Sequence, residues 1–229
     1  MEIENVKGYG LAMSDLEGSW SPAFKKWLKK TSQKIILMQL SFFQKLQLFY
    51  WFGKEKRKAQ GLKLSDIYAK GMRNKSFINQ QLEYLAMFSA LVKTLDKEKA
   101  LTIMYSVMDV TAAEAMLQSS PDAEVIRSFG DPMTFCSKYF EILPEVSKKA
   151  GCHDMSISEN SSDCFQFEVH WCVWYELAKK MGVPEACIPN CYADDVAYPE
   201  YFEKSGIRYS RRQTLAKGGQ CCDFRFERM

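Results

Sequence analysis

Apolar side chains recur at helical spacing through most of the first 150 residues. Between residues 78 and 95 they form two stripes, which predicts a helix that is buried on two sides. Asp96 is a good N-cap for a second helix, and the pattern continues to the Ser-Ser-Pro at residues 119–121. Helix is also expected over residues 131–149, which precede Gly151.

Two further stretches near the N-terminus favour helix. Residues 32–54 are apolar on most sides, and residues 62–73 form a shorter candidate. The whole N-terminal part is therefore expected to be helical.

The period of the pattern changes after Gly151. Met155 and Ile157 alternate with serines, and after a turn at 160–163 the apolar residues at 165, 167 and 169 alternate with polar ones. This alternation is typical of two half-buried strands joined in a hairpin. Residues 207–215 and 222–228 predict two more strands, joined by a turn at 217–220 that contains a glycine pair.

Helices are expected between these hairpins. One runs from about residue 171 to 181, before the G-V-P at 182–184, and a short one opens at Asn190 or Cys191 and ends at Asp195. The predicted class is α+β, with a helical N-terminal part packed on a small antiparallel sheet with covering helices. The expected division is a helical region at 1–130 and an α+β region at 131–229 that contains the cysteines.

Composition places the chain among ordinary globular proteins. It has 229 residues, of which 47% are hydrophobic and 26% charged, and its formal charge is +3. So small a net charge gives no reason to expect a nucleic-acid partner. The N-terminus lacks the apolar core of a signal peptide, and the longest apolar stretch, at 35–43, is too short to span a bilayer. We therefore expect a cytoplasmic protein without a membrane partner, and the oligomeric state is left open.

Reactive side chains are concentrated in the C-terminal part. All eight cysteines and both histidines, His153 and His170, lie at or after Cys136. In a reducing cytosol these cysteines are thiols, metal ligands or nucleophiles. No G-x-S-x-G, H-E-x-x-H, Walker, G-x-G-x-x-G or C-x-x-C motif is present, so any chemistry must rely on thiolates, carboxylates or backbone dipoles.

Three cysteines occupy positions that favour a site. Cys172 follows a strand and begins a helix, and Cys191 begins the next helix with Asp194 on the same face. Cys222 shares a strand face with Phe224. Because a helix N-terminus lowers the pKa of a thiol, we expect Cys191 to be alkylated fastest and the packed Cys222 slowly. The remaining cysteines are interpreted as small buried hydrophobes: Cys136, Cys152, Cys164, Cys187 and Cys221.

Several of these segments are similar to a known family. They are W-C at 171–172 before an amphipathic helix, C-Y-A-D at 191–194 after G-V-P, and the ending T-L-A-K-G-G-Q-C-C-D-F-R-F at 214–226. Together they resemble the L-2-amino-thiazoline-4-carboxylic acid hydrolase family, best over the final 60 residues and more weakly back to Asn74. The chain departs from the family ending by doubling the cysteine at 221–222.

This resemblance implies a bacterial or archaeal cytosolic hydrolase that opens a cyclic amidine thioether with water. Ring opening needs a nucleophile, a proton source and donors for the developing charge. In one version Cys191 or Cys172 attacks, Asp194 moves protons, and helix amides bind the substrate carboxylate.

In a second version Cys172, Cys191 and Cys222 hold zinc or another soft divalent metal, with Asp194 or His170 completing the shell. Spacing does not choose between the two versions, and the cofactor is left open. A non-catalytic module that binds a small molecule or metal through the same thiols is the alternative function. The lysine-rich segment at 25–30 suits either a membrane-surface helix or a solvated helix with Trp27 and Leu28 turned inward, and the second is favoured.

Overall fold

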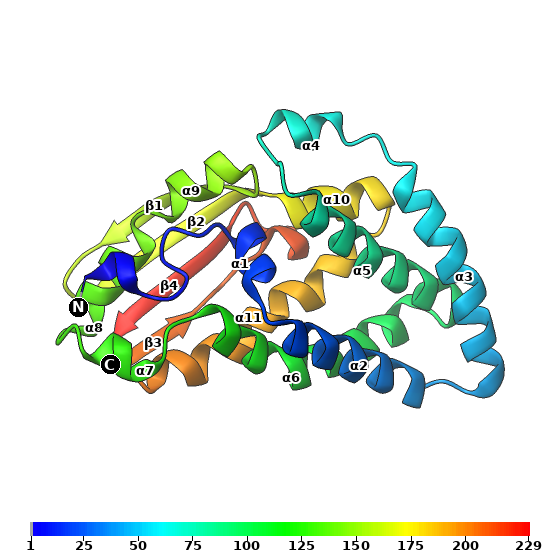
Figure 1. The fold of residues 1–229 in the computed structure, drawn as a ribbon, viewed down its shortest axis with the longest axis horizontal. Coiled ribbons are helices and arrows are strands. Elements are labelled where there is room, and N and C mark those ends of the chain that lie inside the picture. The colour runs from blue at the N-terminus through cyan, green and yellow to red at the C-terminus, as the bar shows by residue number, and fades with distance from the viewer. Residues whose placement is uncertain (1) are drawn as a thin grey trace.

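The computed structural model describes residues 2–229, without the side chain of Glu17. A helical part and a four-stranded sheet lie at opposite ends of the molecule (Figure 1). The α-helices are α1 (Met13–Ser19), α2 (Pro22–Met38), α3 (Phe42–Gln60), α4 (Ser65–Ala69), α5 (Lys75–Thr94), α6 (Lys97–Ser119), α7 (Ala123–Arg127), α8 (Pro132–Phe140), α9 (Leu143–Ala150), α10 (Val173–Met181) and α11 (Cys187–Glu203). Short 3-10 turns are η1 (Ile3–Asn5), η2 (Pro184–Ala186) and η3 (Leu215–Lys217).

The sheet confirms the predicted α+β class. Its strands are β1 (His153–Asn160), β2 (Cys164–Cys172), β3 (Ile207–Ser210) and β4 (Cys222–Arg228). They are arranged in the order β1-β2-β4-β3, and every neighbouring pair is antiparallel. The two predicted hairpins thus pair through their second strands, with Val169 opposite Cys222 and Phe165 opposite Phe226.

The two faces of the sheet differ in character. One face carries apolar side chains, which pack with α8 and the end of α11 into a core of aromatic rings. Phe140 stacks on Phe226 there, with ring centroids 4.9 Å apart. The other face carries Gln166, Glu168 and Arg225 and is polar. The alternation of the sequence is therefore explained by a sheet covered on one side only.

A second core fills the helical part. It buries residues of α5 and α6 together with α3, α10 and the start of α11. Phe88 and Leu91 of α5 are fully buried, as the double stripe in the sequence predicts. Because α10 and α11 also contribute to this core, the chain segment that contains the cysteines joins the sheet to the helical part.

Three predicted elements have different boundaries in the structure. The apolar stretch at 32–54 belongs to two helices, because Ser41 and Gln44 form a capping box that starts α3. The expected helix at 131–149 is also two helices. Asp131 caps α8, and α9 begins just before Pro144, which fits in a first turn because it needs no N–H donor there. Strand β3 ends at Ser210 rather than at residue 215.

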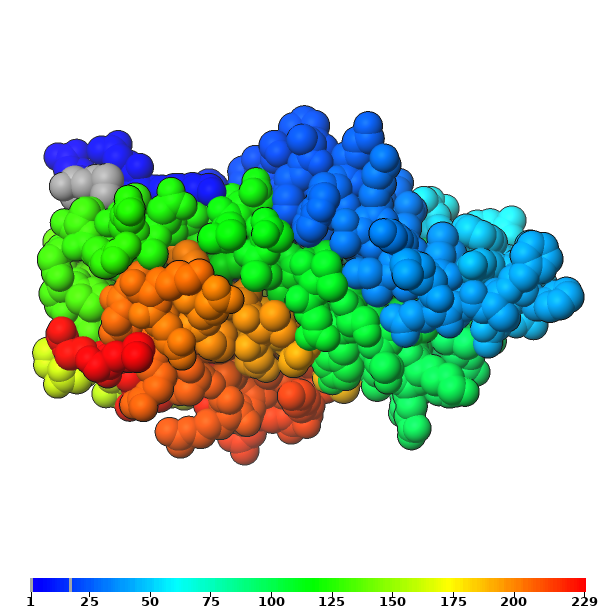
Figure 2. Space-filling model, turned by 90° about the horizontal axis from the view of Figure 1, so that it is seen from below, coloured from blue at the N-terminus to red at the C-terminus, as the bar shows by residue number. Residues whose placement is uncertain are grey.

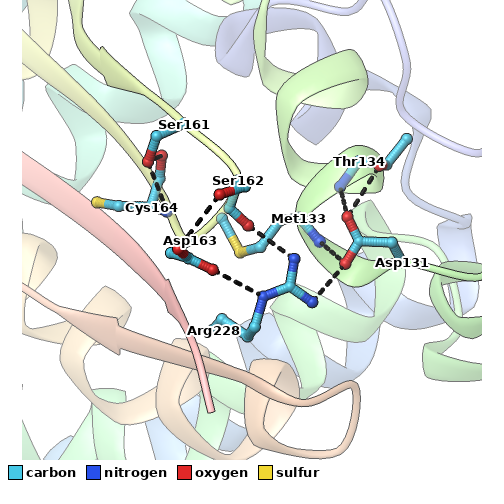
Figure 3. A network of polar contacts seen from close by, with 8 residues as sticks. All are labelled: Asp131, Met133, Thr134, Ser161, Ser162, Asp163, Cys164 and Arg228. Atoms are coloured by element: carbon cyan, nitrogen blue, oxygen red, sulfur yellow. Dashed lines mark hydrogen bonds and ion pairs between the residues drawn. The ribbon is translucent and has the colours of Figure 1, made fainter.

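The C-terminal end of β4 is tied to the rest of the domain by one side chain (Figure 3). The Arg228 guanidinium donates to Asp131 Oδ1 at 2.7 Å, to Asp163 Oδ1 at 3.1 Å and to the Ser162 carbonyl at 2.7 Å. Asp131 is the N-cap of α8, and Ser162 and Asp163 lie in the β1–β2 turn. This network joins the last strand to the turn and to the helix beneath the sheet.

Helix α6 is long and apolar enough to cross a membrane by length and composition. It packs against α2, α5 and α11, and Tyr192 of α11 donates a hydrogen bond to Asp109 at 2.8 Å. A single such helix is weak evidence for insertion, because core helices of soluble proteins meet the same criterion. Its packing is that of a helix in a compact, soluble-like domain.

Candidate functional site: a thiol cluster between β4, α10 and α11

Three elements converge where the sheet meets the helical part. Cys172 ends β2 and is the N-cap of α10, Cys187 and Cys191 lie one turn apart on α11, and Cys222 begins β4. Cys172 and Cys191 are half-buried, whereas Cys187 and Cys222 are buried. The structure therefore brings the three cysteines singled out in the sequence to one place, and adds Cys187.

Cys191 and Cys222 form the centre of the cluster. Their side chains interact through a sulfur hydrogen bond. This bond is the main reason that the pKa of Cys222 is lowered and the pKa of Cys191 is raised, and burial raises the second further. Of the two thiols, Cys222 is therefore the one that loses its proton more readily.

Two other groups stabilise the Cys222 thiolate. The backbone N–H of Leu215 donates to its sulfur at 3.3 Å, and the positive charge of Arg211 also lowers its pKa. Burial and the carboxylate of Asp194 act in the opposite direction. The hydrogen bonds and the charge of Arg211 outweigh these two effects, so the pKa of Cys222 is lowered overall.

The ending of the sequence builds the loop that positions the Leu215 amide. The Thr214 hydroxyl accepts a hydrogen bond from the Lys217 N–H at 3.3 Å, and the Thr214 carbonyl accepts one from the Gly219 N–H at 2.9 Å. A Cβ on Gly219 would lie 2.9 Å from the side chain of Gln213, so only glycine fits there. Asp223 anchors the other side of the loop, accepting from the Gln213 N–H at 2.7 Å.

Arg211 is buried beside the cluster and holds two carboxylates. Its guanidinium donates to Asp194 Oδ2 and to Asp195 Oδ1, each at 2.8 Å, and to the backbone carbonyl of Cys191. Its side chain is 2% exposed and lies 5.1 Å from the ring centroid of Phe224. Burial raises the pKa of Asp194 to about 6, although the charge of Arg211 opposes this rise. A carboxyl group that titrates close to neutral pH therefore lies near the thiol whose pKa is lowered.

The outer thiols have the opposite character. Burial raises the pKa of Cys172 well above its usual value, and Cys187 adds to this, although the backbone N–H groups of Tyr175 and Trp174 at the start of α10 oppose it. Burial also raises the pKa of Cys187 to about 12. Both are neutral thiols that surround the Cys191–Cys222 pair.

The structure corrects two expectations about Cys191. Helix α11 begins at Cys187 and continues to Glu203, because Pro189 lies in its first turn and does not interrupt it. Cys191 is therefore a full turn inside the helix, away from the terminal amides. Its pKa is raised rather than lowered, so the reason for expecting Cys191 to ionise first is wrong, and the order in which the thiols are alkylated stays a prediction.

Sequence reasoning missed Cys187 and Arg211. Cys187 precedes Cys191 by four residues and so lies on the same helical face, a spacing that would have suggested a shared role had the helix start been placed correctly. Nothing in the sequence distinguished Arg211, because its partners come from another element. Cys136, Cys152, Cys164 and Cys221 are buried and do not join the pair.

The arrangement does not favour a metal centre. Among the described side chains, which exclude those of Met1 and Glu17, no three His, Cys, Asp or Glu groups are placed as a metal ion would require. His170 lies on the polar face of the sheet, where its ring is within 3.0 Å of the Ser156 hydroxyl, so it does not complete a shell with the thiols. Asp194 is held by Arg211, which occupies one of its oxygens.

Comparison with known proteins gives one match. The chain matches the family described as L-2-amino-thiazoline-4-carboxylic acid hydrolase over residues 76–226. No curated protein and no solved structure shows significant similarity to it. The match covers well over half of the chain and includes every residue of the thiol cluster. The chain therefore belongs to the L-2-amino-thiazoline-4-carboxylic acid hydrolase family, as its terminal motif suggested.

Proposed function

We propose that this protein is a cysteine-dependent hydrolase that opens a cyclic amidine, such as the 2-amino-thiazoline carboxylate named by its family. The observation that carries the proposal is the lowered pKa of Cys222, which receives hydrogen bonds from Cys191 and from the Leu215 amide. A stabilised thiolate is the form of cysteine that acts as a nucleophile. Such chemistry needs reduced thiols, so we also propose a reducing, cytoplasmic setting.

The thiolate of Cys222 attacks the ring carbon that lies between the ring nitrogen and the ring sulfur. A carbon–sulfur bond forms, the electron pair of the C=N bond moves to the ring nitrogen, and that nitrogen takes up a proton. The intermediate collapses with cleavage of the ring carbon–nitrogen bond, which leaves the former ring carbon bonded to Cys222. Water then attacks this carbon and Cys222 leaves as a thiolate, so that the net reaction consumes one water.

Asp194 is the proposed proton donor to the departing nitrogen. With a pKa of about 6, it holds a proton in a useful fraction of molecules near neutral pH and accepts one back from water in the second step. Arg211 keeps its carboxyl in place at 2.8 Å, which makes Arg211 a positioning residue. The S–H of Cys191 is the second donor near the reacting sulfur.

The substrate carboxylate is assigned to the start of α10. Cys172 is the N-cap residue of this helix, and the backbone N–H groups of Trp174 and Tyr175 oppose the rise in its pKa. Amides at a helix N-terminus favour an anion, and a bound carboxylate would compete for the same donors. Cys172 and Cys191 retain partial exposure, so the substrate would enter past these two side chains.

Hydrolysis of L-2-amino-thiazoline-4-carboxylate by the full chain tests the proposal directly. Loss of substrate and appearance of a ring-opened product are followed by chromatography. The substitution Cys222→Ser is expected to reduce kcat/KM by roughly 1,000-fold or more, since a serine hydroxyl is not ionised at neutral pH. Iodoacetamide labelling with peptide mapping should then modify Cys222 before Cys191 once the site opens.

Cys221→Ser is the matched control, because Cys221 is the adjacent thiol and only accepts a hydrogen bond from Gln213 at 3.4 Å. It is expected to keep kcat/KM within about threefold of the unmodified chain. An active Cys222→Ser variant would contradict the nucleophile assignment. If the unmodified chain binds this substrate without consuming it, the proposed activity is wrong and the protein is a small-molecule-binding module.

A further inference from the structure

An exposed apolar surface lies where α2 and α3 meet, at a corner of the helical part away from the sheet (Figure 1). Its side chains are more than half exposed, and Phe43 reaches 76%. We call this surface the apolar patch, and it consists of Met38, Phe42, Phe43, Leu46, Phe49 and Tyr50. Monomeric soluble proteins rarely expose so many large apolar side chains side by side.

The apolar patch is the outward face of α3, whose inward face already has partners. Leu48 and Ala59 are buried in the helical core, and the buried Glu55 accepts from Ser89 at 2.9 Å and pairs with Lys93. The five patch residues of α3, from Phe42 to Tyr50, lie at spacings of one, three and four, so they form one stripe on the opposite side, and Met38 is the last residue of α2. These rings therefore do not contribute to the core.

The same corner carries a large excess of positive over negative charge. Residues 22–63 hold ten lysines and one arginine against a single acidic residue, Glu55, so this segment has a net charge of +10 in a chain whose total is +3. Lys26, Lys29, Lys30 and Lys34 of α2 are exposed. Figure 2 shows α2 and α3, in blue, projecting together at one end of the molecule.

This combination of charge and apolar side chains selects among possible partners. A second copy of the chain would bring together two segments that each have a net charge of +10, which is unfavourable at an isologous interface. A nucleic acid would be attracted by the lysines but would leave the apolar patch in water. An anionic bilayer surface offers phosphates to the lysines and a boundary region in which aromatic rings are buried.

We propose that the α2–α3 corner binds the surface of a membrane that contains anionic phospholipids. The apolar patch enters the headgroup boundary, and the exposed lysines of α2 contact the phosphates. The lysine-rich segment at 25–30 is thereby a membrane-surface element rather than only a solvated helix. This segment precedes residues 76–226, which match the family, so the proposed binding is separate from the hydrolase site.

Co-sedimentation with vesicles tests the proposal. The full chain is mixed with vesicles of phosphatidylcholine alone or with about one third phosphatidylserine. Binding is expected to be at least about tenfold stronger to the anionic vesicles and to weaken as salt is raised from about 0.05 to 0.5 M. The triple substitution Phe42→Ser, Phe43→Ser and Phe49→Ser is expected to weaken binding at least about tenfold.

Two controls distinguish binding through this surface from non-specific adsorption to vesicles. The double substitution Val110→Ser and Leu117→Ser removes apolar side chains of α6 that are 51% and 46% exposed, and it should leave vesicle binding unchanged. Replacing Lys26, Lys30 and Lys34 by Gln should weaken binding. Replacing Lys97, Lys99 and Lys204, which are at least 60% exposed elsewhere, should weaken it much less.

The proposal is overturned if the unmodified chain does not bind anionic vesicles, or if the phenylalanine variant binds as well as the α6 control. It is also overturned if the apolar patch causes reversible self-association that the phenylalanine variant abolishes while vesicle binding stays the same. Circular dichroism confirms that each variant is folded, and ring-opening activity in solution should be unchanged in all of them.

Discussion

The thiol cluster and the α2–α3 corner use charged and apolar side chains in opposite ways. At the cluster, the side chain of Arg211 is 2% exposed, and its guanidinium donates hydrogen bonds to Asp194 and Asp195. At the corner, the lysines of α2 and the side chains of the apolar patch are exposed. Charge therefore shifts pKa values locally at the thiol cluster. At the corner, in the proposed membrane binding, it attracts anionic phospholipids over a longer range.

The two regions differ in burial, and burial changes the consequence of a substitution. Removing one partner of a buried ion pair is destabilising, because the remaining charge is buried away from water and has no partner. An exposed ring or lysine can be replaced with little effect on folding. Changes at the cluster should therefore alter both folding and chemistry, whereas changes at the corner should alter binding alone.

The largest effect on stability is expected for Arg211→Gln. This substitution leaves Asp194 and Asp195 without their shared cation, and the free energy of unfolding should fall by about 3 kcal/mol or more. Urea denaturation followed by circular dichroism measures the change. Arg212→Gln, at an exposed neighbouring position, serves as the control and should change stability by less than about 0.5 kcal/mol. Equal losses in the free energy of unfolding for the two substitutions would contradict a stabilising role of Arg211 at the cluster.

A somewhat smaller effect is expected from the inward face of α3. Leu48 is 2% exposed in the helical core, and Leu48→Ala should lower the free energy of unfolding by about 2–3 kcal/mol through lost burial and a cavity. The measurement is the same urea titration. A loss below about 1 kcal/mol would mean that α3 is only loosely attached to the domain.

The pH dependence of stability should reveal Asp194. Its pKa is raised from an ordinary value of 3.8 to about 6, mainly by burial. A carboxyl group that binds its proton more tightly in the folded state adds stability at low pH, and this contribution is lost as the pH rises through about 6. Between about pH 4 and pH 6, wild-type stability should therefore fall by about 1–2 kcal/mol relative to Asp194→Asn, which does not titrate. Parallel pH curves for the two proteins would show that Asp194 titrates normally.

The smallest effect is expected for Phe43→Ser on the outward face of α3. Because Phe43 is 76% exposed, the free energy of unfolding should change by less than about 0.5 kcal/mol, in contrast to Leu48→Ala on the same helix. Thermal and urea unfolding measure it. A loss above about 1 kcal/mol would place the ring in the core and contradict the surface assignment.

Regular periodicity was sufficient to predict the architecture. The double stripe of α5, the capping Asp96 of α6, and the alternation around Phe165 and Phe224 each correspond to an observed element. These patterns are local and depend on burial, which the order of apolar residues encodes directly. The breaks at Ser41 and Pro144 were missed because a helix start within an apolar run depends on capping and turn geometry rather than on period.

The chain alone also indicated where its chemistry lies, through eight cysteines at or after residue 136 and a terminal motif shared with a family. Which cysteine is ionised depended on contacts between distant segments. The Leu215 amide, the Cys191 thiol and the Arg211 guanidinium meet the Cys222 sulfur only after β3, β4 and α11 have packed together. The pKa of a side chain depends on its burial, on nearby charges and on its hydrogen bonds. Residues that are distant in the sequence supply these, so the spacing of cysteines along the chain does not determine it.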